Sequence, residues 1–239
     1  MALPKEPRQK MINIMYLVLT ALLAINISAE ILNAFKTINE SLEKTNAAVN
    51  ASTSQIIASL AQKLNDPATR DRAAIWKPKA DQVAGYAKET YDYIESLKKE
   101  IIAASTSGDQ LKEDDQNATT RILVKEGKGK QLLEMLKKYK GSVLGTDTLI
   151  NNSFANNFAV NLDPPKSQNS NKKTWEEAYF YMSPTVGALS ILSKFQNDVR
   201  TSENKVVTFC HEQVGKVEVV FDSYAAIVGQ NSNYLMPGQ

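Results

Sequence analysis

The sequence contains no glycine or proline from position 9 to position 66, and this absence constrains the fold more than any other feature. Glycine and proline are the residues that most often end or bend a helix. The same stretch opens with an apolar run from Met11 to Ala29. One helix over the whole stretch would be roughly 90 Å long at ~1.5 Å per residue, of which about 30 Å fits a bilayer. We therefore expect a membrane helix at 11–31 that continues unbroken into a rod outside the membrane.

The charges on either side of the apolar run predict its orientation. Lys5, Arg8 and Lys10 precede the run, whereas the acidic residues Glu30 and Glu40 lie on its other side. By the positive-inside rule, residues 1–10 are cytoplasmic and the rest of the chain lies outside. A cleaved signal peptide is the alternative, but its apolar region is usually about 7 to 15 residues long, shorter than this one. A retained anchor is the better interpretation.

A heptad pattern crosses the expected membrane boundary without a change of phase. This spacing predicts a seam against a partner helix, although the part from Ile38 onward also fits the core of the chain's own bundle. The segment 46–54, rich in Asn, Ala, Ser and Thr, has the weakest helix propensity of the rod. The positions of the pattern are Leu17, Ala21, Ala24, Ser28, Ile31, Phe35, Ile38, Leu42, Thr45, Val49, Ser52 and Ile56.

The remainder of the chain predicts a helical bundle over 32–215. Asp66-Pro67 suits the start of a second helix, with a kink or restart near Lys77 because Pro78 follows. A short extended piece is expected at 121–124, and a third helix from about Lys130. Thr174-Trp175-Glu176-Glu177 has the pattern of a capping box. Two further elements are expected from Ser183-Pro184, which starts a long helix, and from 216–239, where alternation predicts the start of a β-rich domain.

Composition argues against several classes of function. A formal charge of +2 gives no basic footprint for nucleic acid. With one histidine and one cysteine, the chain lacks the residues of a His-rich zinc site, and adjacent Cys210 and His211 point about 100° apart on a helix. Cys210 is expected to be a small core residue. We predict neither enzymatic activity nor a cofactor.

Polar residues inside the apolar run predict a helix that packs within a larger membrane complex, because polar groups in lipid are costly unless they face protein or water. No Asp or Glu lies between Arg8 and Ala29, so a proton-carrying carboxylate would belong to another subunit, and Arg8 is placed to pair with it. A simpler alternative is that two of the polar residues merely anchor the helix at the cytoplasmic interface. The predicted interface consists of Arg8, Asn13, Tyr16, Thr20, Ala24 and Ser28, of which the last three form a row of small residues spaced by four.

Two segments carry a resemblance to a known family. Residues 7–24 (PRQKMINIMYLVLTALLA) closely resemble the N-terminus of the GldM/PorM family, the periplasm-spanning motor subunit of gliding motility and the type IX secretion system. Residues 180–184 (FYMSP) and 192–200 (LSKFQNDVR) resemble its helical domain. The first segment is the more specific, because it holds basic and polar residues in a fixed order within a membrane helix.

The resemblance implies a homodimer in the bacterial inner membrane, with a cytoplasmic N-terminus and a periplasmic bulk. Its paired membrane helices would sit within a ring of GldL/PorL-type two-helix subunits, which carry the membrane carboxylate. Proton flow through the ring would move the helix pair, and the periplasmic part would pass this motion to outer-membrane components. Family members continue into further β-rich domains, so an end at Gln239 is expected to reflect truncation.

A receptor with a periplasmic helical ligand-binding bundle is the main alternative, because such receptors also follow a membrane helix with a bundle. It is disfavoured because a receptor normally needs a cytoplasmic output region, and only about ten residues are expected on that side. An enzyme ranks third for lack of a catalytic constellation.

Overall fold

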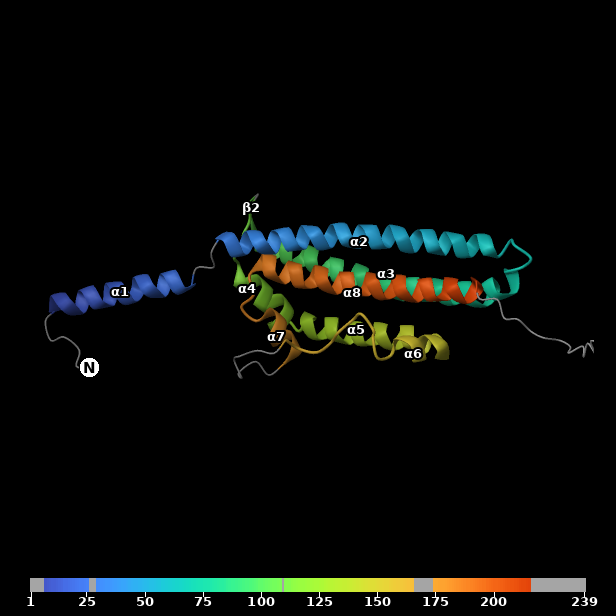
Figure 1. Cartoon of the computed structure of the whole chain (residues 1–239). Coiled ribbons are helices and arrows are strands. Elements are labelled where there is room, and N and C mark those ends of the chain that lie inside the picture. Colours follow the sequence, from blue (N-terminus) through green and yellow to red (C-terminus); the bar gives the residue numbers. More distant parts are fainter. Residues whose placement is uncertain (1–6, 26–28, 109, 166–173, 216–239) are drawn as a thin grey trace, which may run out of the picture.

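The computed structural model describes residues 7–25, 29–108, 110–165 and 174–215. These residues are mostly helical, as predicted (Figure 1). The predicted β-rich segment 216–239 lies outside the described residues. The elements are α1 (Pro7–Ile25), α2 (Ala29–Lys63), α3 (Arg70–Ser105), β1 (Thr106–Ser107), β2 (Gln110–Leu111), α4 (Gln116–Thr119), η1 (Thr120–Lys125), α5 (Lys128–Gly145), α6 (Thr148–Phe154), α7 (Trp175–Phe180) and α8 (Thr185–Gly215).

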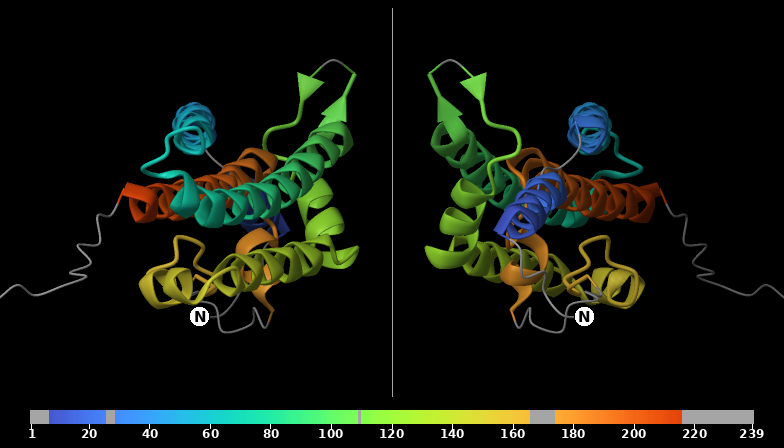
Figure 2. Two further views of the ribbon diagram at one scale, coloured as in Figure 1. Left: turned by 90° about the vertical axis from the view of Figure 1, so that its right-hand side faces the viewer. Right: turned by 90° about the vertical axis from the view of Figure 1, so that its left-hand side faces the viewer.

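The long helices form an elongated bundle in three layers. Viewed end-on, α2 lies alone on one side, α3 and α8 form the middle, and α5 with α6 and α7 covers the opposite side (Figure 2). Helices α2 and α8 run in the same direction, since hydrogen-bonded partners rise together along both: Asn46 pairs with Asn197, and Thr53 with Asn204. Helix α3 runs back in the opposite direction, beside α8 in the middle layer. We call the end where α2 and α8 begin the proximal end, and the opposite end the distal end.

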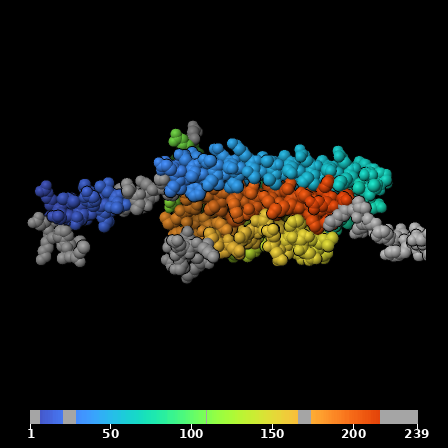
Figure 3. Space-filling view, in the orientation of Figure 1, coloured from blue at the N-terminus to red at the C-terminus, as the bar shows by residue number. Residues whose placement is uncertain are grey.

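Helix α1 extends away from the proximal end of the bundle (Figures 1 and 3). Its side chains from Pro7 to Thr20 are all exposed. Within the described residues, none of the helices combines the length and apolar character needed for a membrane span. The predicted span 11–31 is thus not found as one apolar helix, and the predicted unbroken join to α2 falls partly on residues 26–28, outside the description.

Helix α2 confirms half of the predicted heptad positions and corrects the other half. Phe35, Leu42, Val49 and Ile56 are partly buried, as expected. Their predicted companions lie on the outer face: Ile31 and Ile38 are 51% and 50% exposed, and Thr45 and Ser52 are also exposed. The inward positions instead lie one residue further along, because α8 and α3 together contact a stripe that includes Asn46, Thr53 and Leu60.

Helices α3 and α8 contribute most of the apolar core. Buried residues recur on α3 in steps of three and four, which places them on one stripe. No restart occurs at Pro78, and α3 runs as one helix from Arg70 to Ser105. Proline removes the bond that the Ala74 carbonyl would accept, but Ala74 and Pro78 are both exposed, so water can replace that bond. The α3 stripe is Ala73, Trp76, Ala80, Val83, Ala87, Ile94, Leu97 and Ile101.

The layer opposite α2 is held by local caps and a close backbone approach. The capping box of Thr174 and Glu177 is present at the start of α7, as predicted. Gly129 in α5 packs so closely that an added Cβ would lie 2.6 Å from the carbonyl oxygen of Leu123. The predicted extended piece at 121–124 is wrong, because these residues form the π-helix η1. The wider turn of a π-helix buries Ile122 and Leu123 together, which a strand with alternating sides would not do.

Candidate functional site

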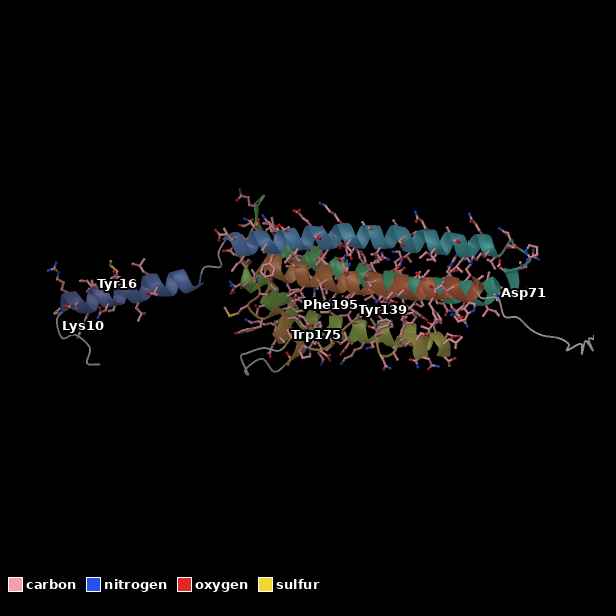
Figure 4. The ribbon with its side chains drawn as sticks, in the orientation of Figure 1. Lys10, Tyr16, Asp71, Tyr139, Trp175 and Phe195 are labelled. Carbon is pink, nitrogen blue, oxygen red and sulfur yellow. The ribbon has the colours of Figure 1, made fainter. Side chains whose placement is uncertain are left out.

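The predicted interface residues lie on α1, apart from the bundle. Asn13, Tyr16 and Thr20 are spaced by three and four residues and share one face of the helix. Tyr16 is 70% exposed, and the Thr20 hydroxyl donates to the Tyr16 carbonyl one turn earlier. Figure 4 shows Tyr16 well beyond the bundle. Arg8 is exposed in the first turn, Ala24 lies in α1 but its side chain is outside the description, and Ser28 is outside the description altogether.

The apolar side chains of α1 from Met11 to Leu19 are exposed, like its polar ones. Met11, Leu17 and Met15 have 72%, 71% and 65% of their surface exposed. Contiguous apolar surface of this kind marks a site that contacts protein or membrane. Helix α1 therefore presents a polar face and two basic residues near its start, Arg8 and Lys10, on a helix that is otherwise largely apolar.

A second group of polar residues lies inside the bundle, between α2 and the α3–α8 layer. We call it the polar seam. Three of its hydrogen bonds join α2 directly to α8: Asn197 to Asn46 at 3.0 Å, Asn204 to Thr53 at 3.0 Å, and Ser193 to Asn39 at 2.6 Å. The three partners are spaced by seven residues along α2, and by four and then seven residues along α8, so each set lies on one face of its helix and the pairs fix the register of the two helices. The seam consists of Asn39, Glu43, Asn46 and Thr53 of α2, Lys98 of α3, and Ser190, Ser193, Gln196, Asn197 and Asn204 of α8.

Lys98 is the charged centre of the polar seam, although it is only 5% exposed. Its ammonium group donates to Glu43 of α2 at 2.8 Å and to the Ser193 hydroxyl of α8 at 2.9 Å. Burial opposes the ionisation of Glu43, but the hydrogen bond and charge of Lys98 outweigh burial and lower the pKa of this carboxyl. Lys98 therefore joins three helices through bonds to charged and polar groups, which are stronger than neutral ones.

Another buried polar group lies on the opposite side of α8. The Tyr139 hydroxyl of α5 hydrogen-bonds with the Ser202 hydroxyl at 2.8 Å. Arg200 donates to Glu203 at 2.8 Å and lies over the Tyr91 ring, with 4.4 Å from its Cζ atom to the ring centroid. Burial raises the pKa of Glu203 and of Tyr139. These residues satisfy one another within the core, which is the arrangement expected of a structural network.

The described residues offer little to bind a metal or to act as a nucleophile. No group of three or more His, Cys, Asp or Glu that could hold a metal ion is found among them. Cys210 is fully buried, as predicted, and burial raises the pKa of its thiol to about 12. A protonated thiol is a poor nucleophile. His211 is near the α2 side of α8 and lies 3.0 Å from the Ser59 hydroxyl.

A surface groove of about 440 Å³ lies between α3 and α5. Its lining includes Tyr93, Glu134 and Lys138. The Tyr93 hydroxyl already donates to Gln131 at 3.2 Å, so part of its polar capacity is used within the protein. The groove bears on the receptor alternative, but it holds no convergent set of free polar groups of the kind that orients a small ligand.

Sequence reasoning identified the polar stripe of α1 but missed the polar seam. The signal was present: Asn39 and Asn46 are seven residues apart, and so are Asn197 and Asn204. A polar residue repeated at core positions of two helices is typical of a pair that specifies its register. The segment 46–54 was instead interpreted only as weak helix, because of its low helix propensity, and the heptad phase through Ile31 and Ile38 placed Thr45 inward in place of Asn46.

A comparison with protein families matches the part of the chain that forms the bundle. The family model described as the GldM N-terminal domain matches residues 30–212, well over half of the chain. The matched region begins with α2 and ends near the end of α8, so it coincides with the described bundle. A search of curated proteins found no match. The chain belongs to the GldM family, the family of motor components of gliding motility and type IX secretion.

Proposed function

We propose that this chain is the moving inner-membrane and periplasmic subunit of a motor driven by the proton-motive force, which powers type IX secretion and gliding. In this proposal the segment 11–31, most of which lies in α1, crosses the membrane, with the N-terminus in the cytoplasm and the bundle in the periplasm. Its support is one observation: α1 exposes apolar side chains together with a polar face, beyond the end of a bundle whose first helix, α2, is the next helix along the chain.

The proposed partners are those that membership of the family implies, and α1 offers an exposed surface for them. A second copy of the chain would supply the second helix of a homodimer, and a ring of GldL/PorL-type two-helix subunits would surround the pair. Asn13, Tyr16, Thr20, Ala24 and Ser28 would line the contact within the ring. Lipid would contact only the part of the α1 surface that the ring subunits do not cover. Outer-membrane secretion components would be reached through further domains after 215.

Arg8 is the residue proposed to pair with the membrane carboxylate of the ring. It is exposed in the first turn of α1, and no acid within α1 is available to neutralise it. A guanidinium stays charged at all physiological pH values and can hold a carboxylate through two parallel hydrogen bonds. Protonation of the carboxylate would weaken this pair, and that change would bias the position of α1.

The proposal is tested by Arg8→Ala, with Lys10→Ala as the matched loss of one basic residue on the same helix. Secretion and gliding are measured in cells, and assembly is checked by co-purification of the ring subunits. We expect Arg8→Ala to reduce both activities at least about tenfold with assembly intact, as loss of a buried charge partner would, and Lys10→Ala to have little effect. Full activity of Arg8→Ala in an assembled complex would remove Arg8 from the mechanism.

The stoichiometry is tested separately by native mass spectrometry of the complex released in mild detergent. Two copies of this chain with several ring subunits are expected. A single copy without ring subunits would contradict the proposed partners, whatever the outcome for Arg8.

A further inference from the structure

The two halves of α2 are attached to the bundle in different ways. Near the distal end, Leu60 is fully buried in the apolar core cluster, and Ile56, Ile57 and Leu64 pack against that cluster. In the proximal half the two fully inward positions are Asn46 and Thr53, both 2% exposed. The distal half is thus held by apolar packing in the core cluster, whereas the proximal half is held by hydrogen bonds and by the partly buried Phe35, Leu42 and Val49, which lie outside that cluster.

The α3–α8 surface under the proximal half is suited to exposure to water. Without α2, Lys98 keeps its bond to Ser193, and Gln196 still donates to Glu95 of α3 at 3.0 Å. The groups that lose a partner are hydroxyls, amides and a lysine, all of which water can solvate. A net hydrogen bond contributes only about 0.5–1.5 kcal/mol, because water replaces a lost partner that is accessible to it. Release of the proximal half therefore has a small free-energy cost per contact.

The other contacts that hold the proximal half to the rest of the molecule are ion pairs and single hydrogen bonds. Glu43 reaches Lys98 at 2.8 Å, and Lys36 forms a surface ion pair with Glu113 at 2.5 Å. Ser190 donates to the backbone carbonyl of Phe35 at 2.8 Å. Surface ion pairs contribute at most about 1 kcal/mol, so among these three ties the Lys98–Glu43 bond, with its buried ammonium group, is the strongest.

From these contacts we infer that the proximal half of α2, residues 29–53, is a lever that releases from the α3–α8 layer about a fixed distal attachment at Leu60, with Lys98 as its latch. Residues 29–53 lie nearest to α1, so a displacement of α1 reaches the lever first. The use of the lever in transmission rests on the proposed function. Its existence does not, because it follows from the contacts of α2 alone.

Thiol labelling measures release directly. In Asn46→Cys a thiol is placed under the proximal half, and the native Cys210, buried in the apolar core, serves as the internal reference in the same molecule. The full chain is labelled with a maleimide in its membrane complex, and both rates are read by peptide mass spectrometry. We expect position 46 to react at least about tenfold faster than position 210, because local release requires less free energy than opening of the core. Thr53→Cys repeats the test if Asn46→Cys assembles poorly.

The latch is tested by adding Lys98→Gln to Asn46→Cys. We expect labelling at position 46 to rise about tenfold further, the size of effect given by losing one charged hydrogen bond. Lys88→Gln is the matched control, because Lys88 pairs with Asp92 on the exposed face of the same helix. Equal rates at positions 46 and 210 would overturn the lever, and an unchanged rate in Lys98→Gln would overturn Lys98 as the latch.

The role of the lever is tested by tethering it. A short bis-thiol reagent joins cysteines placed at Asn46 and Asn197, and a distal control joins Ser59 and His211, with Cys210→Ala in both. We expect the proximal tether to reduce secretion at least about tenfold and the distal tether to leave it within about twofold, because only the proximal half must move. Fast labelling at position 46 combined with normal secretion under the proximal tether would support the existence of the lever and contradict its role in transmission, whereas the proposed function itself is tested by Arg8→Ala.

Discussion

Helix α8 contacts two long helices through two chemically different faces. Toward α3 it buries apolar residues such as Val199 and Val206 in one continuous cluster with Ile94 and Leu97. Toward α2 it presents Ser193, Asn197 and Asn204, which form hydrogen bonds. An apolar interface is lost to water only at a high free-energy cost, whereas a polar one exchanges its partners for water. The α3–α8 pair is thus a rigid frame, and the proximal part of α2 is an attached, exchangeable element.

The largest effect is expected from damage to the frame. Ile94→Ala removes a fully buried side chain from the core cluster. Loss of the transferred surface plus the residual cavity should reduce the free energy of unfolding by about 2–5 kcal/mol. Urea unfolding of the purified chain measures the change.

Ile75→Ala provides the control for this prediction, as the same substitution on the same helix at a side chain that is 56% exposed. Its effect should stay within about 0.5 kcal/mol. Equal losses for the two variants would mean that the α3–α8 cluster is not the rigid frame described above.

A smaller effect is expected in the layer opposite α2, where Gly129 of α5 packs closely against the backbone of η1. In Gly129→Ala the new Cβ would lie 2.6 Å from the Leu123 carbonyl oxygen and 2.7 Å from the Cβ of Glu176. Neither atom is the end of a flexible side chain, so α5 must shift, at a cost of about 1–3 kcal/mol. Urea unfolding again measures the loss.

Gly141→Ala tests whether that loss comes from the close approach. Gly141 lies in the same helix with nothing within 4 Å of an added Cβ. Alanine there should raise stability by about 0.4–1 kcal/mol through the unfolded chain. A loss of stability in both variants would point to the helix itself instead of its contact with η1.

The sequence predicted the bundle well because its signals are local. The capping box at Thr174 and the start of α8 after Ser183-Pro184 depend on a few neighbouring residues, and both are present. Cys210 was also placed correctly in the core. The failures at Pro78 and at 121–124 have other origins. At Pro78 the helix continues because water can replace the lost backbone bond at an exposed position, and at 121–124 tertiary packing overrode a local preference.

The candidate sites were predicted unequally for a related reason. Asn13, Tyr16 and Thr20 stand out because a polar residue is unusual in an apolar run. Asn46 and Asn197 do not stand out in two amphipathic helices, and their pairing across about 150 positions depends on which helices become neighbours. A shift of one residue in the assumed register moved Ile38 inward and Asn46 outward. Only the three-dimensional arrangement of α2, α3 and α8 shows the polar seam.

The contrast between the two faces of α8 predicts an opposite sign for substitutions in the polar seam. Asn46→Leu combined with Asn197→Leu replaces both partners of one hydrogen bond with apolar groups of similar shape. Such a change is expected to leave stability unchanged or to raise it by up to about 1 kcal/mol. Secretion should fall at the same time, because the proximal half of α2 would be held more firmly.

Asn50→Leu is the matched control for the double variant, since Asn50 lies on the exposed face of α2. It should change neither stability nor secretion appreciably. A loss of more than about 2 kcal/mol in the double variant would indicate that the polar seam is a specific, tightly packed interface like that between α3 and α8.

The smallest effect concerns pH at the distal attachment of α2. Burial, and then the nearby charge of Lys63, lower the pKa of His211 despite the opposing Glu212. The folded chain therefore favours the neutral imidazole. Its contribution to stability is complete above the unfolded pKa of about 6.5, declines as pH falls toward the lower folded pKa, and levels off below it. Urea midpoints at several pH values between about 7.5 and 5 measure this decline.

His211→Gln should remove this part of the pH dependence, because glutamine can still hydrogen-bond to Ser59 but does not titrate. The fall in the urea midpoint between about pH 7.5 and pH 5 should become shallower in the variant. Glu212→Gln is the control, since it removes a charge at the neighbouring exposed position and leaves the imidazole in place. An identical pH profile for His211→Gln and the unsubstituted chain would show that the distal attachment depends on the apolar packing of Leu60 and its neighbours alone.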